Sequence, residues 1–298
     1  IAAQLGTLPL SLYYFHQFPV YFWLAGWVVV LGGAVFLWGG FLLVLLHGLA
    51  PAAAAMLGWA LYHWIWAMNR AIVAIQQLPG NVWSGIWIEA WPACILGVFT
   101  CLFAWSSARR NTRGVLASLI LLAVLAAGFA GQTIANIRQK QITLYHANRS
   151  FVLDLFAGEK QYTLRAGLND RQEKFTAQAH RWACGVREAE NLNDPAHAPG
   201  LFWQAPFLQF YQKKLLLIDR DFRFGDWRGP PVPVDALILH GNPRIDLEAC
   251  LRQFPCRLVV FSASNGRYRV ERWKTVCRAR QLAFYDVGER GAWQMTLP

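Results

Sequence analysis

Residues 20–47, VYFWLAGWVVVLGGAVFLWGGFLLVLLH, form a long apolar run without a single charged side chain. A helix that crosses a membrane needs about 20 apolar residues, because hydrocarbon offers no water to its backbone N–H and C=O groups. Buried helices of soluble proteins rarely continue this far without a polar face. The run therefore predicts a membrane-spanning helix, and it argues against a chain that is soluble throughout.

Further apolar segments predict additional spans. Residues 115–135 are apolar almost throughout, and residues 93–107 are apolar but short unless their helix begins near Ile86. Residues 51–78 mix aromatic residues with Arg70. This segment could lie along the membrane surface or cross the membrane with Arg70 near its end, and we favour the span. The sequence thus predicts three or four spans.

The first residues differ in character from these spans. Residues 1–17 are amphipathic and aromatic, which favours an interfacial or re-entrant helix. His16 and Arg70 are the ionisable groups that would line a polar path through the membrane part. The chain begins at Ile1 without a basic segment or a small-residue cleavage site, so we interpret its start as part of a longer chain and not as a signal peptide.

Glycine pairs punctuate the first predicted span. Gly32 with Gly33, and Gly39 with Gly40, would offer a surface on which another helix packs closely. That pattern predicts a bundle and not a lone anchor. Glycine is also simply common in membrane helices, so this alternative stays open.

Charge divides the chain in two. Residues 1–136 hold four basic residues and one acid, whereas the other 24 Lys and Arg and 16 Asp and Glu follow, giving the second part a net charge of +8. We therefore expect a membrane α-helical bundle over 1–136 and a soluble domain over 137–298.

The orientation depends on one short loop. Arg109, Arg110 and Arg113 lie between the last two predicted spans, and positive loops remain in the cytoplasm. The soluble domain would then lie on the opposite, external side of the membrane. Arg138 and Lys140, just after the last span, act in the opposite sense.

The soluble part begins with three short alternating segments, residues 141–147, 150–157 and 160–166. They are rich in β-branched and aromatic residues, and a glycine-containing connection, FAGEK, joins the second to the third. Three adjacent strands should open the domain. Residues 168–198 are polar, and 191–200 is typical of a loop.

Strands and helices then alternate along the chain. Further strands are predicted at 214–220, 235–240, 257–263, 282–287 and 291–297. Residues 242–254 are predicted to form a turn that leads into an amphipathic helix, and residues 268–280 a second amphipathic helix. This alternation is typical of a layered α/β (or α+β) domain.

Two stretches carry a resemblance to a known family. Residues 2–19, AAQLGTLPLSLYYFHQFP, are similar to the segment before the late membrane helices of ComEC-type DNA-uptake proteins, and residues 234–293 resemble the C-terminal end of shortened ComEC relatives. The resemblance implies a bacterial inner-membrane protein that passes single-stranded DNA into the cytoplasm during natural transformation. It also implies a shortened, degenerate metallo-β-lactamase-like domain.

The chemistry of an active domain of that kind is missing from the sequence. Two metals need clustered ligands, in a pattern such as His-x-His-x-Asp-His, and the soluble part has only His146, His180, His197 and His240, none near another in sequence. His240 and Gly241 stand where active relatives have a His-His-Gly turn. We interpret this turn as a relic, with His240 in a structural role.

Other catalytic patterns are absent too, including the nucleophile elbow and the phosphate-binding loops. We therefore expect no enzyme activity, no metal and no cofactor. Asp154, Asp219 and Asp235 lie in or beside strands, where a hydrogen-bonded structural role is expected.

Four cysteines of the soluble part, Cys184, Cys250, Cys256 and Cys277, could form disulfides in three pairings if the domain is external, but their irregular spacing favours reduced, buried thiols.

The densest basic stretch is the predicted helix near the end of the chain. On a helix Val270, Trp273 and Cys277 share one face, and basic residues project away from it. Such an array could hold phosphates regardless of base sequence, with a tyrosine for stacking. The candidate nucleic-acid contacts are Arg267, Tyr268, Arg269, Arg272, Lys274, Arg278 and Arg280. A solvated helix face is the plainer alternative.

These observations favour a membrane component of a channel that imports single-stranded DNA. Its expected partners are single-stranded DNA, membrane lipids and other DNA-uptake proteins, and a homo-oligomer is a further candidate assembly. Two alternatives stay open. One is a membrane-bound, metal-dependent hydrolase or nuclease whose site is completed by a preceding part of the chain, and the other is a structural anchor whose soluble domain docks a partner.

Overall fold

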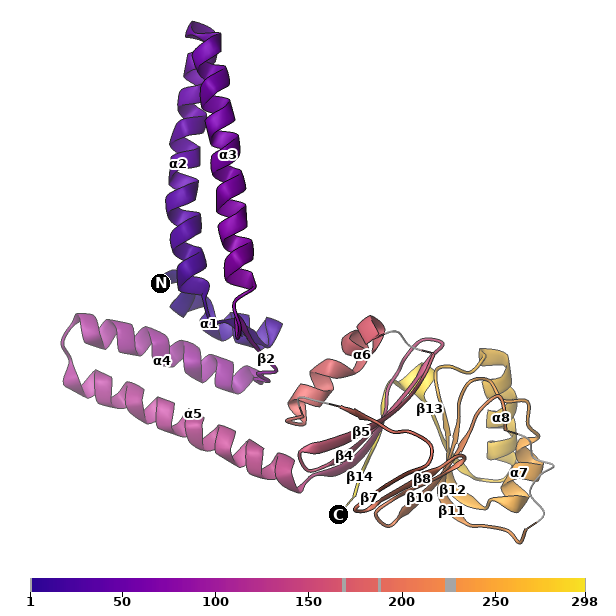
Figure 1. The fold of residues 1–298 in the computed structure, drawn as a ribbon. Coiled ribbons are helices and arrows are strands. Elements are labelled where there is room, and N and C mark those ends of the chain that lie inside the picture. Colours follow the sequence, from indigo (N-terminus) through magenta and orange to yellow (C-terminus); the bar gives the residue numbers. More distant parts are fainter. Residues whose placement is uncertain (1, 168–169, 187–188, 223–228, 298) are drawn as a thin grey trace. The chain divides into compact units, whose positions relative to one another are not determined.

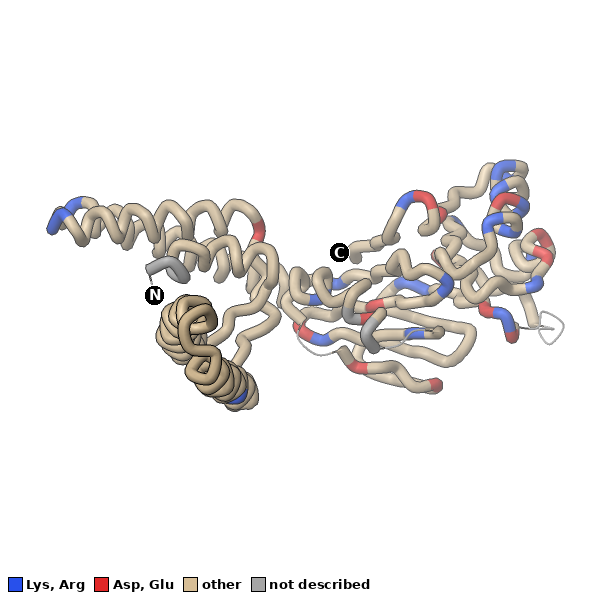
Figure 2. Tube along the Cα trace, turned by 90° about the horizontal axis from the view of Figure 1, so that it is seen from above, with Lys and Arg blue, Asp and Glu red and all other residues tan. Residues whose placement is uncertain are grey.

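The computed structural model describes residues 2–167, 170–186, 189–222 and 229–297. These residues form two compact units, 1–128 and 129–298. The two units differ in charge: Lys, Arg, Asp and Glu are sparse along the first and frequent in the second (Figure 2). The boundary lies within a helix, whose last turns belong to the second unit.

The first unit is helical (Figure 1). Its helices are α1 (Ala2–Phe15), α2 (Phe22–Leu49), α3 (Pro51–Gln76), α4 (Ala90–Ala108) and α5 (Thr112–Arg138). A short antiparallel ribbon of β1 (Gln17–Pro19) and β2 (Val82–Ser84) joins them. Among the described residues, three helices are long and apolar enough to cross a membrane, namely α2, α4 and α5. These three correspond to the three apolar runs that the sequence predicts as spans.

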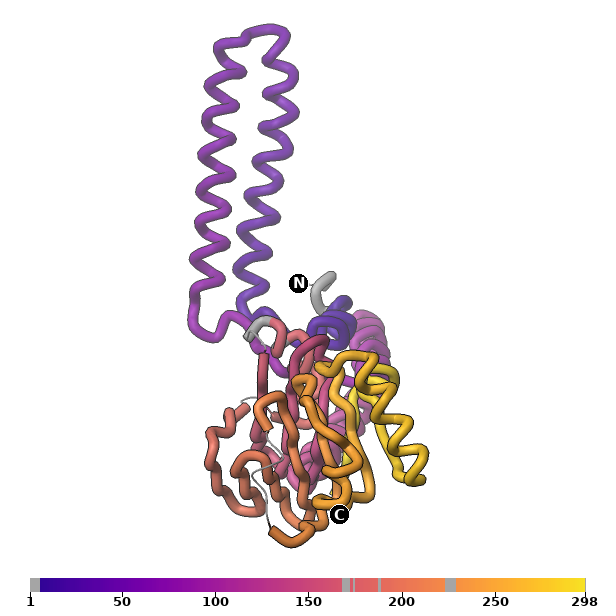
Figure 3. Tube along the Cα trace, turned by 90° about the vertical axis from the view of Figure 1, so that its right-hand side faces the viewer, coloured from indigo at the N-terminus to yellow at the C-terminus, as the bar shows by residue number. Residues whose placement is uncertain are grey.

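Helices α2 and α3 form an antiparallel hairpin (Figure 3). They approach closely at Gly32 and Gly39: a Cβ added at Gly39 would lie 2.6 Å from a methyl carbon of Leu61, and the indole N–H of Trp64 donates to the carbonyl of Gly32 at 3.0 Å. The predicted close helix packing is thus present at one glycine of each pair. Gly33 and Gly40 have no neighbour within 4 Å of a built Cβ.

Residues 51–76 of the segment 51–78 form helix α3. This helix is 26 residues long, as long as a span requires, but it is not among the three helices that are apolar enough to cross a membrane. Arg70 lies near its end, with the guanidinium 5.4 Å from the ring centroid of Trp66. His16, at the start of the ribbon, stacks on Trp87 at 4.5 Å.

The second unit contains two β-sheets. The smaller one has the strand order β14-β3-β4-β5-β6. Its strands are β3 (Lys140–Leu144), β4 (Phe151–Ala157), β5 (Lys160–Ala166), β6 (Glu190–Asn191) and β14 (Trp293–Thr296). The three opening strands are adjacent and antiparallel, as predicted. The last strand, β14, pairs with the first strand of the domain, β3.

The larger sheet has the order β13-β12-β11-β10-β9-β8-β7. Its strands are β7 (Ala196–Ala198), β8 (Leu201–Gln204), β9 (Phe207–Phe210), β10 (Lys213–Ile218), β11 (Val234–Leu239), β12 (Cys256–Phe261) and β13 (Ala283–Asp286). Strands β10 to β13 are parallel, whereas β7 to β10 form an antiparallel meander. Strands β10, β11 and β12 contain continuous apolar runs, as expected for strands buried on both faces, whereas the edge strand β13 is only partly buried.

The two sheets pack face to face, because one apolar core contains residues of both, such as Leu153 of β4 and Ile238 of β11. Helices cover the outer faces (Figure 1). Helix α7 (Leu247–Gln253) and helix α8 (Arg267–Ala279) pack on the larger sheet, and α6 (Asp170–Ala183) packs on the smaller one. A short helix, α9 (Val287–Arg290), follows β13. The domain is a layered α/β sandwich, as predicted.

A buried ion group attaches α6 to its sheet. The carboxylate of Asp154, wholly buried on β4, accepts from Nε and Nη2 of Arg181 at 2.8 and 3.0 Å, and from the hydroxyl of Thr163 at 2.8 Å. Glu173 accepts from Arg181 at 2.7 Å. Burial raises the pKa of the Tyr145 phenol beside this group, and the Asp154 carboxylate raises it further. Asp154 therefore has the hydrogen-bonded position expected from its place in a strand.

The structure contains elements that the sequence pattern does not predict. Strand β7 lies within the predicted loop 191–200, and β8 and β9 follow it. Residues 170–183, described from the sequence only as polar, form α6; its buried face contains Ala177 and Arg181 in place of large apolar residues, so the usual apolar repeat is missing. Residues 242–254 form a turn that leads into α7, as predicted, and Asp246 caps this helix by accepting from the N–H of Glu248 at 3.0 Å. None of the described cysteines is bridged, in keeping with reduced thiols.

We expect Gly39→Leu to destabilise the α2–α3 hairpin by about 1 to 3 kcal/mol, because the new side chain must displace Leu61. Gly40→Leu is the matched control, since it changes the same residue type in the same turn without meeting a neighbour. The melting temperature of the detergent-solubilised protein is the measurement. Equal losses for the two variants would contradict the packing.

Candidate functional site

The carboxyl ends of the four parallel strands meet at one edge of the larger sheet. Open α/β sheets place their ligands at this edge. Asp219 follows β10, His240 follows β11, Ser262 follows β12, and Asp286 ends β13. This carboxyl edge therefore brings Asp219 and His240, which the sequence singles out, to the same side of the sheet as Ser262 and Asp286.

His240 lies over an aromatic ring. Its imidazole stacks on Phe151 of the smaller sheet, with ring centroids 4.0 Å apart and an interplanar angle of 19°. Burial lowers the pKa of His240 to about 4, although the charge of Asp219 acts in the opposite direction. The ring is therefore neutral at physiological pH. It borders a cavity of about 360 Å³ between the two sheets.

The turn after His240 is fixed by the neighbouring loop. Gly241 and Asn242 adopt positive φ angles of 67° and 65°, which explains why small or amide residues stand here. The N–H of Gly241 donates to the Ser264 hydroxyl, and that of Asn242 to the Asn265 side-chain carbonyl, both at 2.9 Å. The predicted relic turn is thus a braced connection between the loops after β11 and β12.

The four histidines of the domain do not converge. His146 follows β3, where its Nδ1 donates to the carbonyl of Val287 at 2.7 Å, and His180 lies on α6, bonded to Tyr145. His197 lies on β7 and His240 at the end of β11. Across the described ranges, one group of three potential metal ligands comes within 4.8 Å, and it contains no histidine.

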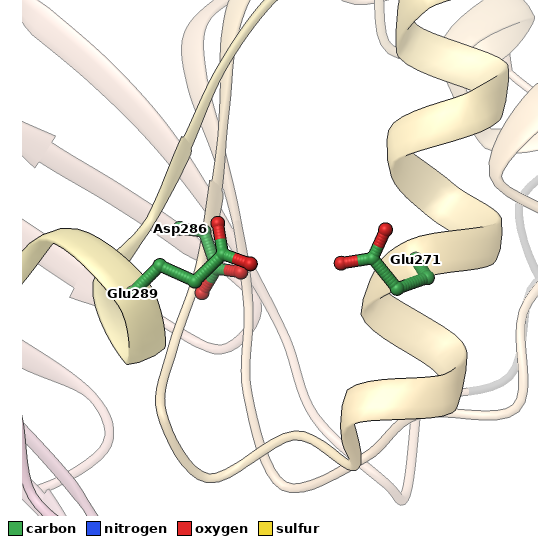
Figure 4. Close-up of side chains that lie close together, drawn as sticks. All are labelled: Glu271, Asp286 and Glu289. Carbon is green, nitrogen blue, oxygen red and sulfur yellow. The ribbon is translucent and has the colours of Figure 1, made fainter.

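That group surrounds a lysine. Glu271, Asp286 and Glu289 come from α8, the end of β13 and α9 (Figure 4). The ammonium of Lys274 lies 2.7 Å from Asp286 and 2.8 Å from each of the two glutamates, and its side chain is almost fully buried. A cation of the chain itself thus occupies the position between the three carboxylates.

These carboxylates also set the charge state of Lys274. Burial alone lowers the pKa of the ammonium, but the hydrogen bonds with Asp286, Glu271 and Glu289 outweigh it and raise the pKa above its usual range. The expectation that Lys274 flanks an exposed basic face is therefore wrong. The sequence offered one signal, since Glu271 precedes Lys274 by three residues, but the other two acids come from later elements.

Three of the remaining candidates contact other parts of the domain. Arg269 donates to the backbone carbonyls of Asn242 and Pro243, so it braces the turn after β11. Arg280 pairs with Glu248 of α7 at 2.9 Å, and the guanidinium of Arg278 lies 5.7 Å from the ring centroid of Phe284.

Three exposed candidates without a named partner lie in the first half of the helix. Arg267, Tyr268 and Arg272 are exposed, Tyr268 to 85%. Arg278 and Arg280 at its end are exposed as well, but each contacts a neighbour. The apolar residues Val270, Trp273 and Cys277 are buried against the sheet, as predicted. Arg267 also borders a second polar cavity of about 370 Å³, together with His146 and Asn265. The exposed basic surface of α8 is thus centred on Arg267 and Arg272 at the carboxyl edge.

Lys274→Met should lower the stability of α8 and β13 by about 3 kcal/mol, because it leaves Asp286 buried without its cation while the two glutamates are half exposed. Arg280→Met on the same helix breaks an exposed pair and should cost less than about 1 kcal/mol. Hydrogen exchange of the α8 and β13 amides in detergent measures both. An equal effect of the two variants would show that Lys274 does not hold these elements together.

Comparisons with known proteins agree with this architecture. A family model described as the ComEC C-terminal domain matches residues 142–297, more than half of the chain, and a model described as Competence protein matches residues 1–110. No curated protein and no solved structure matches the chain. The chain therefore belongs to the ComEC family of competence proteins, as a membrane protein with a role in competence DNA uptake.

Proposed function

We propose that this protein is part of a channel that carries single-stranded DNA across the bacterial inner membrane during natural transformation. The observation that carries the proposal is the combination, in one chain of this family, of helices able to cross a membrane with a soluble domain. The net charge of +8 beyond residue 136 favours a nucleic-acid strand over the alternative of a structural anchor whose domain docks a protein partner.

The proposed position of the domain is the external side. The loop between α4 and α5 and the first turn of α5 carry Arg109, Arg110 and Arg113, and such clusters stay in the cytoplasm. If α5 spans the membrane, the chain after Arg138 lies on the opposite face. The domain would then meet the incoming strand before it enters the membrane part, where Arg70 and His16 remain the candidates for a polar path.

The strand would be held by its phosphates at the exposed surface of α8. Arg267 and Arg272 are exposed cations without an ion pair among the described residues, and Tyr268 offers an exposed ring for stacking. Positive charge with an aromatic ring binds single strands with little regard to sequence. Arg269 and Lys274 do not belong to this surface, since each is engaged within the fold.

We further infer that the domain does not hydrolyse the strand. His240 is stacked on Phe151 and partly buried, and the other three histidines lie on separate elements, so the donor set of a binuclear centre is dispersed over the described residues. The strand-end histidine fits the relic of a metallo-β-lactamase-like turn. Zinc analysis of the full-length protein addresses the alternative of a hydrolase, since a bound metal pair would contradict this inference.

The double variant Arg267→Ser, Arg272→Ser should weaken binding of single-stranded DNA by the full chain in detergent micelles. Each lost phosphate contact should make the dependence of log K on log salt shallower by about 0.7. Arg252→Ser with Arg257→Ser removes the same charge from exposed positions of α7 and β12 and is the control. Equal salt dependence in both variants would remove α8 from the interface, and an end-labelled strand reports any cleavage in the same experiment.

A further inference from the structure

The cavity beside His240 lies between the two sheets at the carboxyl edge, apart from the exposed surface of α8. It has a volume of about 360 Å³, within the usual range for small-molecule sites. Four aromatic side chains border it, namely Phe151, Trp203, Phe222 and His240. Three charged side chains, Asp219, Asp221 and Arg165, border it as well.

The walls suit a flat, uncharged ring. His240 lies parallel to Phe151, so the two rings form a stacked platform, and the low pKa of His240 keeps that platform neutral. Trp203 and Phe222 add further aromatic surface. Heteroaromatic rings stack on such platforms, and enzymes that read an extruded base hold it between aromatic and apolar side chains.

The carboxylates that border the cavity would accept hydrogen bonds from donors on a ligand. Asp219 uses one carboxylate oxygen, Oδ1, to accept from the N–H groups of Asp221 and Phe222 at 3.1 and 3.0 Å, and Asp221 is exposed. Ionised carboxylates only accept, so their free oxygens match amino groups on a ligand. Among nucleobases, cytosine, adenine and guanine carry an exocyclic amino group, whereas uracil and thymine carry carbonyls there.

Arg165 provides a positive charge next to these acids. Its guanidinium pairs with Glu173 at 2.6 Å, and about a third of its side chain, 35%, is exposed. A base stacked beside this ring pair would leave its phosphate outside, where the guanidinium offsets the repulsion by the two aspartates. A bare metal ion fits the cavity less well, because no described trio of metal-capable groups that includes Asp219, Asp221 or His240 comes within 4.8 Å.

We propose that this cavity holds one nucleobase bearing an exocyclic amino group, stacked beside the ring pair of Phe151 and His240 and bonded to Asp219 and Asp221. The base could belong to a DNA strand or to a free nucleotide, and only the first source rests on the proposed function. A strand bound through its phosphates at α8 would then also be bound through one of its bases in this cavity.

The test compares oligodeoxycytidine with oligodeoxyuridine of equal length, binding to the full chain in detergent micelles. The two differ at the amino position, so the wild type should bind the cytidine strand about fivefold or more tightly. Asp221→Asn should remove this preference, since an amide offers the amino group a weaker, uncharged acceptor. Ala166→Trp, at an exposed position bordering the cavity, should block it without removing a polar group.

Ala283→Trp is the matched control, because it adds the same ring at an exposed alanine that does not border the cavity. The arginine variants of α8 should weaken both strands equally and keep the preference. Equal binding of the two strands by the wild type overturns the proposal, as does a preference that survives Ala166→Trp.

The mononucleotides dCMP and dUMP separate the two sources of the base. If the protein binds neither strand but prefers dCMP, the cavity takes a free nucleotide and the proposed function fails alone. If it binds both strands equally and neither nucleotide, the cavity proposal fails while the phosphate contacts at α8 stand.

Discussion

Hydrocarbon offers no hydrogen bonds to a backbone, and this constraint organises the whole chain. It requires the apolar segments to be helical, and it keeps ionisable side chains out of α2, in which His47 near the end is the exception. Nearly all charge is thereby left to the second unit. Both the membrane part and the basic soluble domain follow from this single division.

The soluble domain satisfies its buried carboxylates with cations of its own. Arg181 pairs with Asp154 and Glu173 beneath α6, and Lys274 pairs with Asp286 and its two neighbouring glutamates beneath α8. Removing one partner from such a group costs more than the pair contributes, which makes each group a strong constraint on how its helix docks. The salt bridges of Lys274 fix the side of α8 that packs on the sheet, and Arg267 and Arg272 are therefore exposed to solvent.

Much of this architecture could be predicted from the sequence because apolar pattern dominates it. The spans, the opening three strands and the parallel strands β10 to β13 all follow from runs of apolar residues. Helix α6 could not be predicted in this way, because its buried face contains Arg181 and small residues instead of large apolar ones. The partners of Arg181 lie partly on distant strands. The role of Lys274 was hidden for the same reason: a local pattern shows the lysine, but only the tertiary fold brings Asp286 and Glu289 to it. The cavity beside His240 likewise needs Phe151 and Trp203 from different sheets.

The central claim is that this protein moves DNA across a membrane. It is tested most directly in a strain from which the gene has been deleted, by supplying labelled double-stranded DNA and measuring how much labelled single strand reaches the cytoplasm. The account predicts that DNA still binds to the cell but that no labelled strand appears inside, and that the intact gene restores uptake. Wild-type uptake in the deletion strain would contradict it.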